Sequence, residues 1–474
     1  MSDIRLDGRS LTPRQLTAIA EGARPVLDAT ARARMAAGVR TGDWLAQKWS
    51  WLVGGEPPAE PAERVRRFIL GHCAGVGPPL AQPMVRALIA ARVNVLACGF
   101  SGVRPEIADA LLQLLDGPLP WIPSQGSVGT AGSPTLAHVA QVLCGLGGRV
   151  WGDSGPVASE VRAVEVTEKE ALALVNGDSL TAAWAGLVVA RSRRLLEAAE
   201  AACALTFEVV RADLRCLDAE AMQERRHPGP IAVAERLRLR LSGSELCYEG
   251  RTPDPFSIRC APAVLGAAWE VLEFVETVVE RELNAAVDNP LMFGDRTVEA
   301  GNFHSAAAAM AMDQLKIALT QVASISERRT FRLTYGQLSG LPSFLVPSTG
   351  LNSGLMLAQY TTASLVSEMK GLSHPASVDS IPSVQHREDH ASMGPIAGRT
   401  AWDCTETLAD VLAIELMCAS QGLEFHMDEG KQASRDSMLT HARVRSLVRR
   451  WTEDRVLHPD LKALGTAVRG GVFS

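Results

Sequence analysis

Tyrosine is nearly absent from this chain of 474 residues, in which Tyr248, Tyr335 and Tyr360 are the only three. Chemistry that needs a phenolic hydroxyl therefore has few candidates. Long apolar runs are absent too, since none approaches the length of about 20 residues that a membrane-spanning helix needs. The first residues lack a basic region followed by an apolar core, so we expect no signal peptide there.

An excess of positive charge is also missing. The net charge is −6 and the pI is near 6.0, so electrostatics give no reason to expect nucleic acid or an anionic membrane as a partner. The nine cysteines contain no C-x-x-C pair, which argues against a disulfide framework or a zinc site and favours a reducing cytoplasm. No glycine-rich phosphate loop or metal-ligand spacing occurs, and we expect no metal.

What the sequence does have is helical periodicity. Apolar residues recur at spacings of three and four along residues 264–278 and 312–326, and the alanine-rich stretches 181–206 and 405–420 have helix-forming composition. Few segments alternate as strands do. The pattern predicts an all-α, mostly helical protein built on a long central helix bundle.

The most informative segment is residues 126–138, Gly-Ser-Val-Gly-Thr-Ala-Gly-Ser-Pro-Thr-Leu-Ala-His. It resembles the signature G-S-V-G-A-S-G-D-L-A-P-L-A-H of the histidine and aromatic amino-acid ammonia-lyases and aminomutases. In that family the Ala-Ser-Gly tripeptide cyclises and dehydrates into an electrophilic methylidene-imidazolone, MIO. The matching tripeptide here is Thr130-Ala131-Gly132, whose central residue has no hydroxyl to eliminate. We therefore expect a member of the family without MIO and with no other cofactor.

Neighbouring residues offer one substitute precursor. Ser133 precedes Pro134, whose nitrogen carries no hydrogen, so this serine cannot form the ring. Thr130, between Gly129 and Ala131, is chemically permitted and would give a ring shifted by one residue. A histidine-type ammonia-lyase or aminomutase with such a Thr130-derived ring remains one alternative.

The resemblance continues in order along most of the chain. Matches include G-F-S-G-I-R at 99–104, L-x-N-G at 174–177, E-L-N-S-A-T-D-N-P-L at 282–291 and G-N-F-H at 301–304. It implies the helical ammonia-lyase fold, with a smaller N-terminal helical region (1–115) that contributes to the active site, a central bundle domain (116–425) and a C-terminal helical tail (426–474). It also implies a homotetramer whose active sites are built from several subunits.

Both tyrosines of the family's site are replaced. The family's N-terminal loop carries a catalytic tyrosine, whereas residues 49–55, roughly the matching stretch, contain none. In the family's D-x-Y-S-L-R-C the tyrosine position is Phe256, which can pack but cannot transfer a proton. Arg259 in the same segment matches the carboxylate-binding arginine, although a structural ion pair is the alternative.

The resemblance assigns the remaining site residues. Asn176 matches a residue that contacts ring and substrate, unless it only caps a helix or turn. His72 matches a substrate-contacting histidine, and the alternative is a buried core residue. Phe303 would line the pocket or simply pack.

One further segment has changed its charge. Glu388 matches a glutamate that faces the substrate, and the family's N-Q-E-D-H has become His386-Arg387-Glu388-Asp389-His390. His386 could act as an acid or base and Arg387 could hold an anion, or both could be drift on an unused surface.

Two functions compete. The first is an MIO-independent enzyme that performs elimination, addition or cyclisation on a small, carboxylate-bearing, amino-acid-derived substrate. Arg259 and Asn176 would bind this substrate, and proton transfer would fall to Glu388, His72 or His386. The second is a non-catalytic binding or regulatory homologue, a pseudoenzyme.

Overall fold

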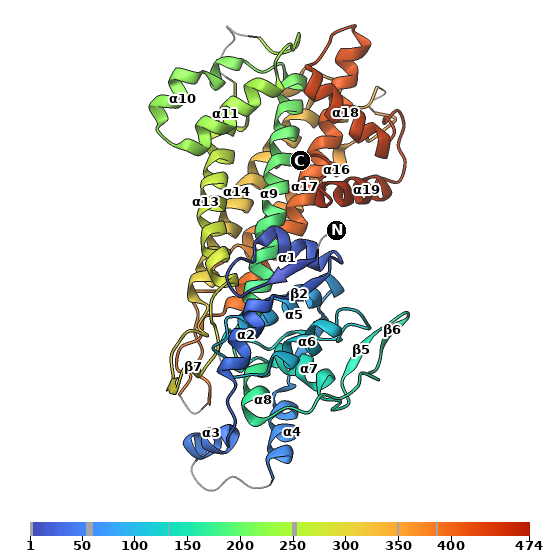
Figure 1. Ribbon diagram of the computed structural model, residues 1–474. Helices are drawn as coiled ribbons and strands as arrows, with labels where there is room; N and C mark the ends of the chain where they lie inside the picture. The colour runs from blue at the N-terminus through green and yellow to red at the C-terminus, as the bar shows by residue number, and fades with distance from the viewer. Residues whose placement is uncertain (1–2, 54–59, 131, 249–253, 348–349, 385–386) are drawn as a thin grey trace. The chain divides into compact units, whose positions relative to one another are not determined.

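The computed structural model describes residues 3–53, 60–130, 132–248, 254–347, 350–384 and 387–474 (Figure 1). Within these ranges the chain forms nineteen α-helices, two short 3-10 helices and eight strands, the strands paired in four two-stranded sheets. The predicted all-α class is confirmed. The helices predicted from periodicity and composition are confirmed as well, and they are the four long ones α9 (Ser179–Val210), α13 (Ala261–Leu283), α14 (Ala306–Thr334) and α17 (Gly394–Asp428).

The chain divides into two compact units, each assembled from three stretches of sequence. The first comprises residues 1–190, 275–313 and 375–399, and the second comprises residues 191–274, 314–374 and 400–474. Each of the four long helices contributes residues to both units.

The first unit holds most of the short elements. They are β1 (Ile4–Leu6), α1 (Pro13–Ala20), β2 (Pro25–Leu27), α2 (Ala29–Gly38), α3 (Trp44–Val53), α4 (Pro61–His72), β3 (Val76–Pro79), α5 (Gln82–Ala97), α6 (Pro105–Gln113), β4 (Pro123–Gln125), α7 (Pro134–Leu143), β5 (Arg149–Gly152), β6 (Gly155–Ala158), α8 (Glu168–Val175), β7 (Leu291–Phe293) and β8 (Arg296–Val298). β1 pairs with β2 in parallel, and the other three pairs, β3–β4, β5–β6 and β7–β8, are antiparallel.

Local sequence determines where three of these helices begin. α4 and α7 each have proline at the first helical position, where no N–H is needed. The hydroxyl of Ser133 caps α7 by accepting from the Leu136 amide. α8 begins with a capping box between Thr167 and Glu170. α4, α7 and α8 pack against one another, and α3 packs on α4 and α8, so the ends of these helices are brought together.

The second unit contains the remaining elements. They are η1 (Leu214–Leu217), α10 (Ala219–Arg225), α11 (Pro228–Arg240), α12 (Phe256–Arg259), α15 (Gly336–Ser339), η2 (Ser343–Leu345), α16 (Met356–Leu372), α18 (Arg435–Leu447) and α19 (His458–Arg469). Inside this unit a fully buried ion pair joins α14 to α17, because Arg329 donates to Glu415 through Nε at 2.5 Å and Nη2 at 2.9 Å. Ser326 and Thr206 donate to the same carboxylate, so its oxygens are well satisfied.

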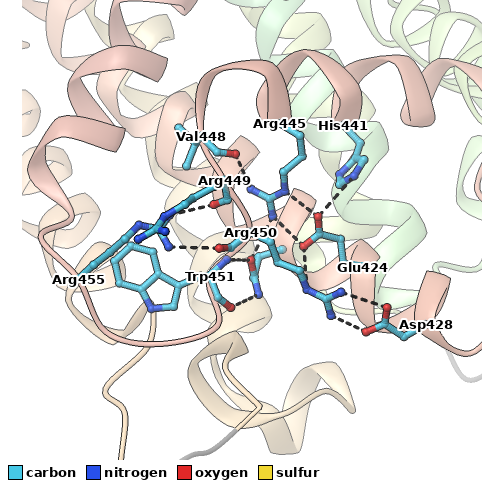
Figure 2. Close-up of polar contacts among 10 residues, drawn as sticks. Glu424, Asp428, His441, Arg445, Val448, Arg449, Arg450, Trp451 and Arg455 are labelled. Carbon is cyan, nitrogen blue, oxygen red and sulfur yellow. Dashed lines mark hydrogen bonds and ion pairs between the residues drawn. The ribbon is translucent and has the colours of Figure 1, made fainter.

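A second polar cluster ties the C-terminal segment to α17 (Figure 2). Glu424 accepts from Arg445 at 2.7 Å and lies 3.3 Å from Nε of Arg450 and 3.6 Å from Nε2 of His441. Gln421 bonds both the N–H and the C=O of Trp451 at 2.9 Å. The loop that follows α18 is therefore held by contacts with side chains of α17 and not by regular secondary structure.

No helix in the described ranges combines the length and the apolar character that crossing a bilayer would require. All nine cysteines are free thiols.

Candidate active site

The degenerate tripeptide lies where the start of α7 meets the ends of α4 and α8. Gly132 forms an isolated antiparallel bridge with Asn176, and the Ser133 amide donates to the Val175 carbonyl at 3.0 Å. A β-carbon added at Gly132 would lie 3.4 Å from Cδ2 and 3.5 Å from Nε2 of His72. Three of the predicted site residues are therefore in one place. Ala131 lies outside the described residues.

His72 is the last residue of α4, and a hydrogen bond defines the tautomer of its ring. Its Nδ1 lies 2.7 Å from the Phe68 carbonyl, which can only accept, so Nδ1 carries the hydrogen and Nε2 is left toward Gly132. Burial lowers the pKa of His72, and the nearby Lys48 cation lowers it further, while Glu388 acts in the opposite direction. The ring is thus biased to the neutral form with an available Nε2 lone pair.

Asn176 is buried and half-satisfied. It follows α8 as the C-cap residue, and its Nδ2 donates to the Asn289 carbonyl at 2.6 Å. Its Oδ1 is buried without a donor among the described residues. Asn176 therefore caps the helix, and its contact with ring and substrate stays a prediction, for which Oδ1 is an unused acceptor beside Gly132.

A buried hydroxyl network holds the other end of the tripeptide loop. Ser392 donates to the Gly129 carbonyl at 3.0 Å and lies 3.0 Å from the hydroxyl of Ser305. Ser305 donates to Asp178, and Thr181 does so at 2.5 Å. Burial raises the pKa of Asp178, and these hydrogen bonds oppose the rise. Sequence analysis missed Asp178, although it directly follows the matched Leu174–Gly177 motif.

Glu388 lies on the same unit and is half-buried. Its carboxylate accepts from Ser383 Oγ at 3.0 Å, and it is close enough to His72 to affect that ring's pKa. The adjacent Arg387 is exposed. His386 lies outside the described residues, so its predicted role is not addressed by this geometry.

Lys48 is a second residue that was not predicted from the sequence. The family's tyrosine loop was expected at 49–55, but α3 is helical through Val53, and Gly54 and Gly55 lie outside the described residues. The Nζ atom of Lys48 lies 5.6 Å from the centre of the Phe68 ring, which is 4.3 Å from the His72 ring. Burial lowers the pKa of Lys48, while the carboxylates of Glu388, Glu299 and Asp288 oppose the shift. The only sequence signal was its place one residue before the expected loop.

Three other predicted residues lie on other elements. Phe303 is half-buried in the turn before α14. Arg259 and Phe256 belong to the second unit, at the two ends of α12. The Arg259 guanidinium stacks over the Phe256 ring at 4.7 Å and is exposed, with no carboxylate partner among the described residues. The structural ion pair considered as the alternative for Arg259 is therefore not seen in the described part of the chain.

The residues around Gly132 do not fit the precursor that MIO needs. Position 131 is alanine, and the hydroxyl of Ser133 is the α7 cap. Thr130, which is buried, is the one side chain of the tripeptide with a hydroxyl. No chemical step is therefore assigned to MIO.

The helical fold with this cluster is that of the ammonia-lyases and aminomutases, and comparison with known proteins identifies the family. Residues 11–446 match the family described as Aromatic amino acid lyase, so the chain belongs to that family. It is 41% identical over 512 residues to histidine ammonia-lyase of Anaeromyxobacter sp. (strain K), covering 99% of each chain.

Solved structures agree. The histidine ammonia-lyase of Trypanosoma cruzi superposes with a TM-score of 0.91 at 35% identity, covering 100% of this chain and 94% of the other. Tyrosine aminomutase of Streptomyces globisporus gives a TM-score of 0.89 at 32% identity, covering 100% and 98%.

Proposed function

We propose that this chain is a lyase that acts without MIO on a small, carboxylate-bearing substrate derived from an amino acid with an imidazole-like side chain. The observation that carries the proposal is the position of Gly132 against His72 and Asn176. Residues that match the family's site thus lie beside a tripeptide whose central residue has no hydroxyl to eliminate. The relatives named histidine ammonia-lyase support the choice of side chain.

Each of the proposed site residues has a role in substrate binding that its chemistry allows. Neutral His72 offers Nε2 as an acceptor for the N–H of an imidazole, and Asn176 Oδ1 presents a partial negative charge that can face a cationic substrate nitrogen. Glu388 supplies negative charge near a cationic substrate nitrogen. Arg259 can hold the carboxylate through two parallel hydrogen bonds. In the homotetramer that we propose from the family resemblance, Arg259 would reach the cluster of another subunit.

Loss of the electrophile restricts the substrate. An ordinary amine leaves poorly and its β-proton is weakly acidic, so elimination without MIO requires a better leaving group or a more acidic proton. A quaternary ammonium satisfies the first condition, because it departs as a neutral amine.

A second candidate rests on the Ser392–Gly129 hydrogen bond. A ring built on Thr130 would form by attack of the Ala131 nitrogen on the Gly129 carbonyl, and Ser392 donates to that same oxygen at 3.0 Å. The hydrogen bond would polarise this carbonyl. A histidine-type ammonia-lyase with a shifted ring is therefore the alternative function.

Intact-protein mass spectrometry separates the two candidates. We expect the mass of the unmodified sequence, and a chain lighter by two waters would instead establish the ring. Turnover is then measured with histidine and with its N,N,N-trimethyl derivative by the ultraviolet absorbance of an unsaturated product. We expect conversion of the trimethyl compound alone, abolished by Arg259→Ala and by Glu388→Ala. No conversion of either, with ligand binding that depends on Arg259 in calorimetry, would establish a binding protein instead.

A further inference from the structure

Lys48 lies at the edge of the cluster, in a position that the assigned functions leave unused. It is carried by α3, which packs on the two helices α4 and α8 that end at His72 and next to Asn176. Its Nζ is 5.6 Å from the centre of the Phe68 ring, and the Phe68 and His72 ring centroids are 4.3 Å apart. His72 in turn faces Gly132. Lys48, Phe68, His72 and the degenerate tripeptide thus form one continuous series of contacts.

Among the described residues, no carboxylate or hydrogen-bond acceptor pairs with Nζ of Lys48, and this atom lies over the aromatic face of Phe68. The charged groups that act on it from neighbouring elements are the carboxylates of Glu388, Glu299 and Asp288, and the titratable ring of His72, which is biased to its neutral form, lies against Phe68. The three carboxylates favour its protonated form, yet burial outweighs them and lowers the pKa of Lys48. Lys48 is half-buried, and a lysine that is partly removed from water beside an aromatic ring loses its proton more readily than an exposed lysine does.

We propose that Lys48, as the neutral amine, is the base that removes the substrate's β-proton in place of the missing tyrosine. This proposal rests on the proposed function. In the step, the Cβ–H electrons form the Cα=Cβ double bond, the leaving group departs with the electrons of its bond to Cα, and Lys48 becomes the ammonium. The ammonium then returns its proton to the departing amine or to water.

Burial favours lysine over tyrosine for this task. The unperturbed pKa values of the two side chains are similar, about 10.4 for lysine and about 10 for tyrosine. Burial moves them in opposite directions, since the basic form of lysine is neutral and the basic form of tyrosine is an anion. Where no electropositive ring stabilises a phenolate, burial favours the basic form of lysine and disfavours that of tyrosine.

The first test needs no substrate. The whole protein is reductively methylated with carbon-13 formaldehyde, and each dimethyl-lysine signal is followed by NMR as the pH is raised. The chain has only six lysines, and loss of one signal in Lys48→Arg assigns it. We expect Lys48 to titrate at a clearly lower pH than the exposed Lys370 and Lys462. A midpoint equal to or above theirs would overturn the proposal.

The second test separates a base from a fixed positive charge. Lys48→Arg keeps the charge but cannot lose a proton at working pH. We expect kcat to fall about 100-fold or more in both Lys48→Arg and Lys48→Met, within the usual contribution of a general base. The exposed variant Lys462→Met is the matched control and should be unchanged. Near-normal kcat in Lys48→Arg would show that only the charge matters, and would refute the proposal.

Chemical rescue excludes a purely structural defect. Methylamine or ethylamine added to Lys48→Ala should restore part of kcat, and the rate should rise with pH as the free amine forms. If Lys48→Ala has the thermal midpoint of the wild type and no amine restores its activity, the assignment of Lys48 as the base is contradicted. If the wild type converts no substrate, the proposed function fails, while the NMR titration still decides the state of Lys48.

Discussion

At position 131, serine would supply the hydroxyl that ring formation eliminates, and the contacts on both sides of that position remain in place. Gly132 is bridged to Asn176, and the Gly129 carbonyl is held by Ser392. Ala131→Ser therefore restores the chemical requirement on a loop that is still anchored at both ends. We predict that the purified variant is lighter than its sequence by two waters, measured by intact-protein mass spectrometry.

The control for this variant is Ala131→Thr, which adds a hydroxyl with a methyl group that would crowd the forming methylene. It should cyclise less completely. A folded Ala131→Ser protein of unmodified mass would show that the hydroxyl at position 131 is not sufficient for cyclisation in this loop.

Single residues were only partly predictable. His72 and Asn176 were identified because short motifs fixed their positions, and the structure places both beside Gly132. Lys48 was not predicted because the family resemblance pointed to a tyrosine in a loop. In the structure Lys48 lies in helix α3, which extends to Val53. Asp178 was missed because a carboxylate after an Asn-Gly pair looks like part of an exposed turn, whereas in the structure it is buried and accepts from Ser305 and Thr181.

At the scale of elements, the ion pair between α14 and α17 should contribute strongly to stability. Both side chains are completely buried, and removing one partner leaves an uncompensated charge. We predict that Arg329→Met lowers the free energy of unfolding by about 3–5 kcal/mol, as measured by urea denaturation.

The double variant Arg329→Met/Glu415→Met removes both charges and should be less destabilised than Arg329→Met alone. It will not recover fully, because Ser326 and Thr206 lose their shared acceptor. A double variant less stable than the single one would show that the hydroxyl contacts, and not the stranded charge, dominate.

The stability of the protein should depend on pH through His441, which belongs to the polar cluster at the end of α18. Burial lowers the pKa of His441, and Arg445 and Arg450 lower it further, although the carboxylate of Glu424 acts in the other direction (Figure 2). The unfolded chain then binds a proton at His441 more readily than the native chain does. The stabilising contribution is complete above the unfolded value of about 6.5 and is lost as pH falls below it.

We therefore expect the thermal midpoint to fall less between pH 7.5 and pH 5.5 in His441→Gln than in the wild type, as followed by circular dichroism. Some dependence will remain, since burial also lowers the pKa of His72 and His138. The exposed His458→Gln is the control and should keep the full wild-type dependence. An identical slope in His441→Gln would contradict the assignment.

Elements were more predictable than residues. The four long helices follow from apolar spacing and alanine content, because a repeat over many turns leaves little ambiguity. The short helix α3 had no such repeat, and the family resemblance suggested a loop there. The loop after α18 has no periodicity at all, and its order depends on side chains such as Gln421 that bond its backbone.

At the scale of the whole molecule, the chain does not fold as consecutive blocks. Each unit is assembled from three separate stretches, and the long helices contribute to both. Sequence order alone cannot show this, since contacts between distant segments decide it. Within the chain, Lys48, His72 and Glu388 belong to one unit, and Arg259 belongs to the other.

In the proposed homotetramer, the sharing of site residues between subunits can be tested by mixing variant subunits. If one subunit supplies Lys48 and Glu388 and another supplies Arg259, neither Arg259→Ala nor Lys48→Met subunits alone can build a complete site. Mixed assemblies, co-expressed with two different affinity tags and purified through both, should regain activity. Random mixing in equal amounts gives about a quarter of the sites both intact residues, so activity near that fraction is expected. Sites built from a single subunit would leave the mixed assemblies as inactive as their parents, because no subunit then carries both groups.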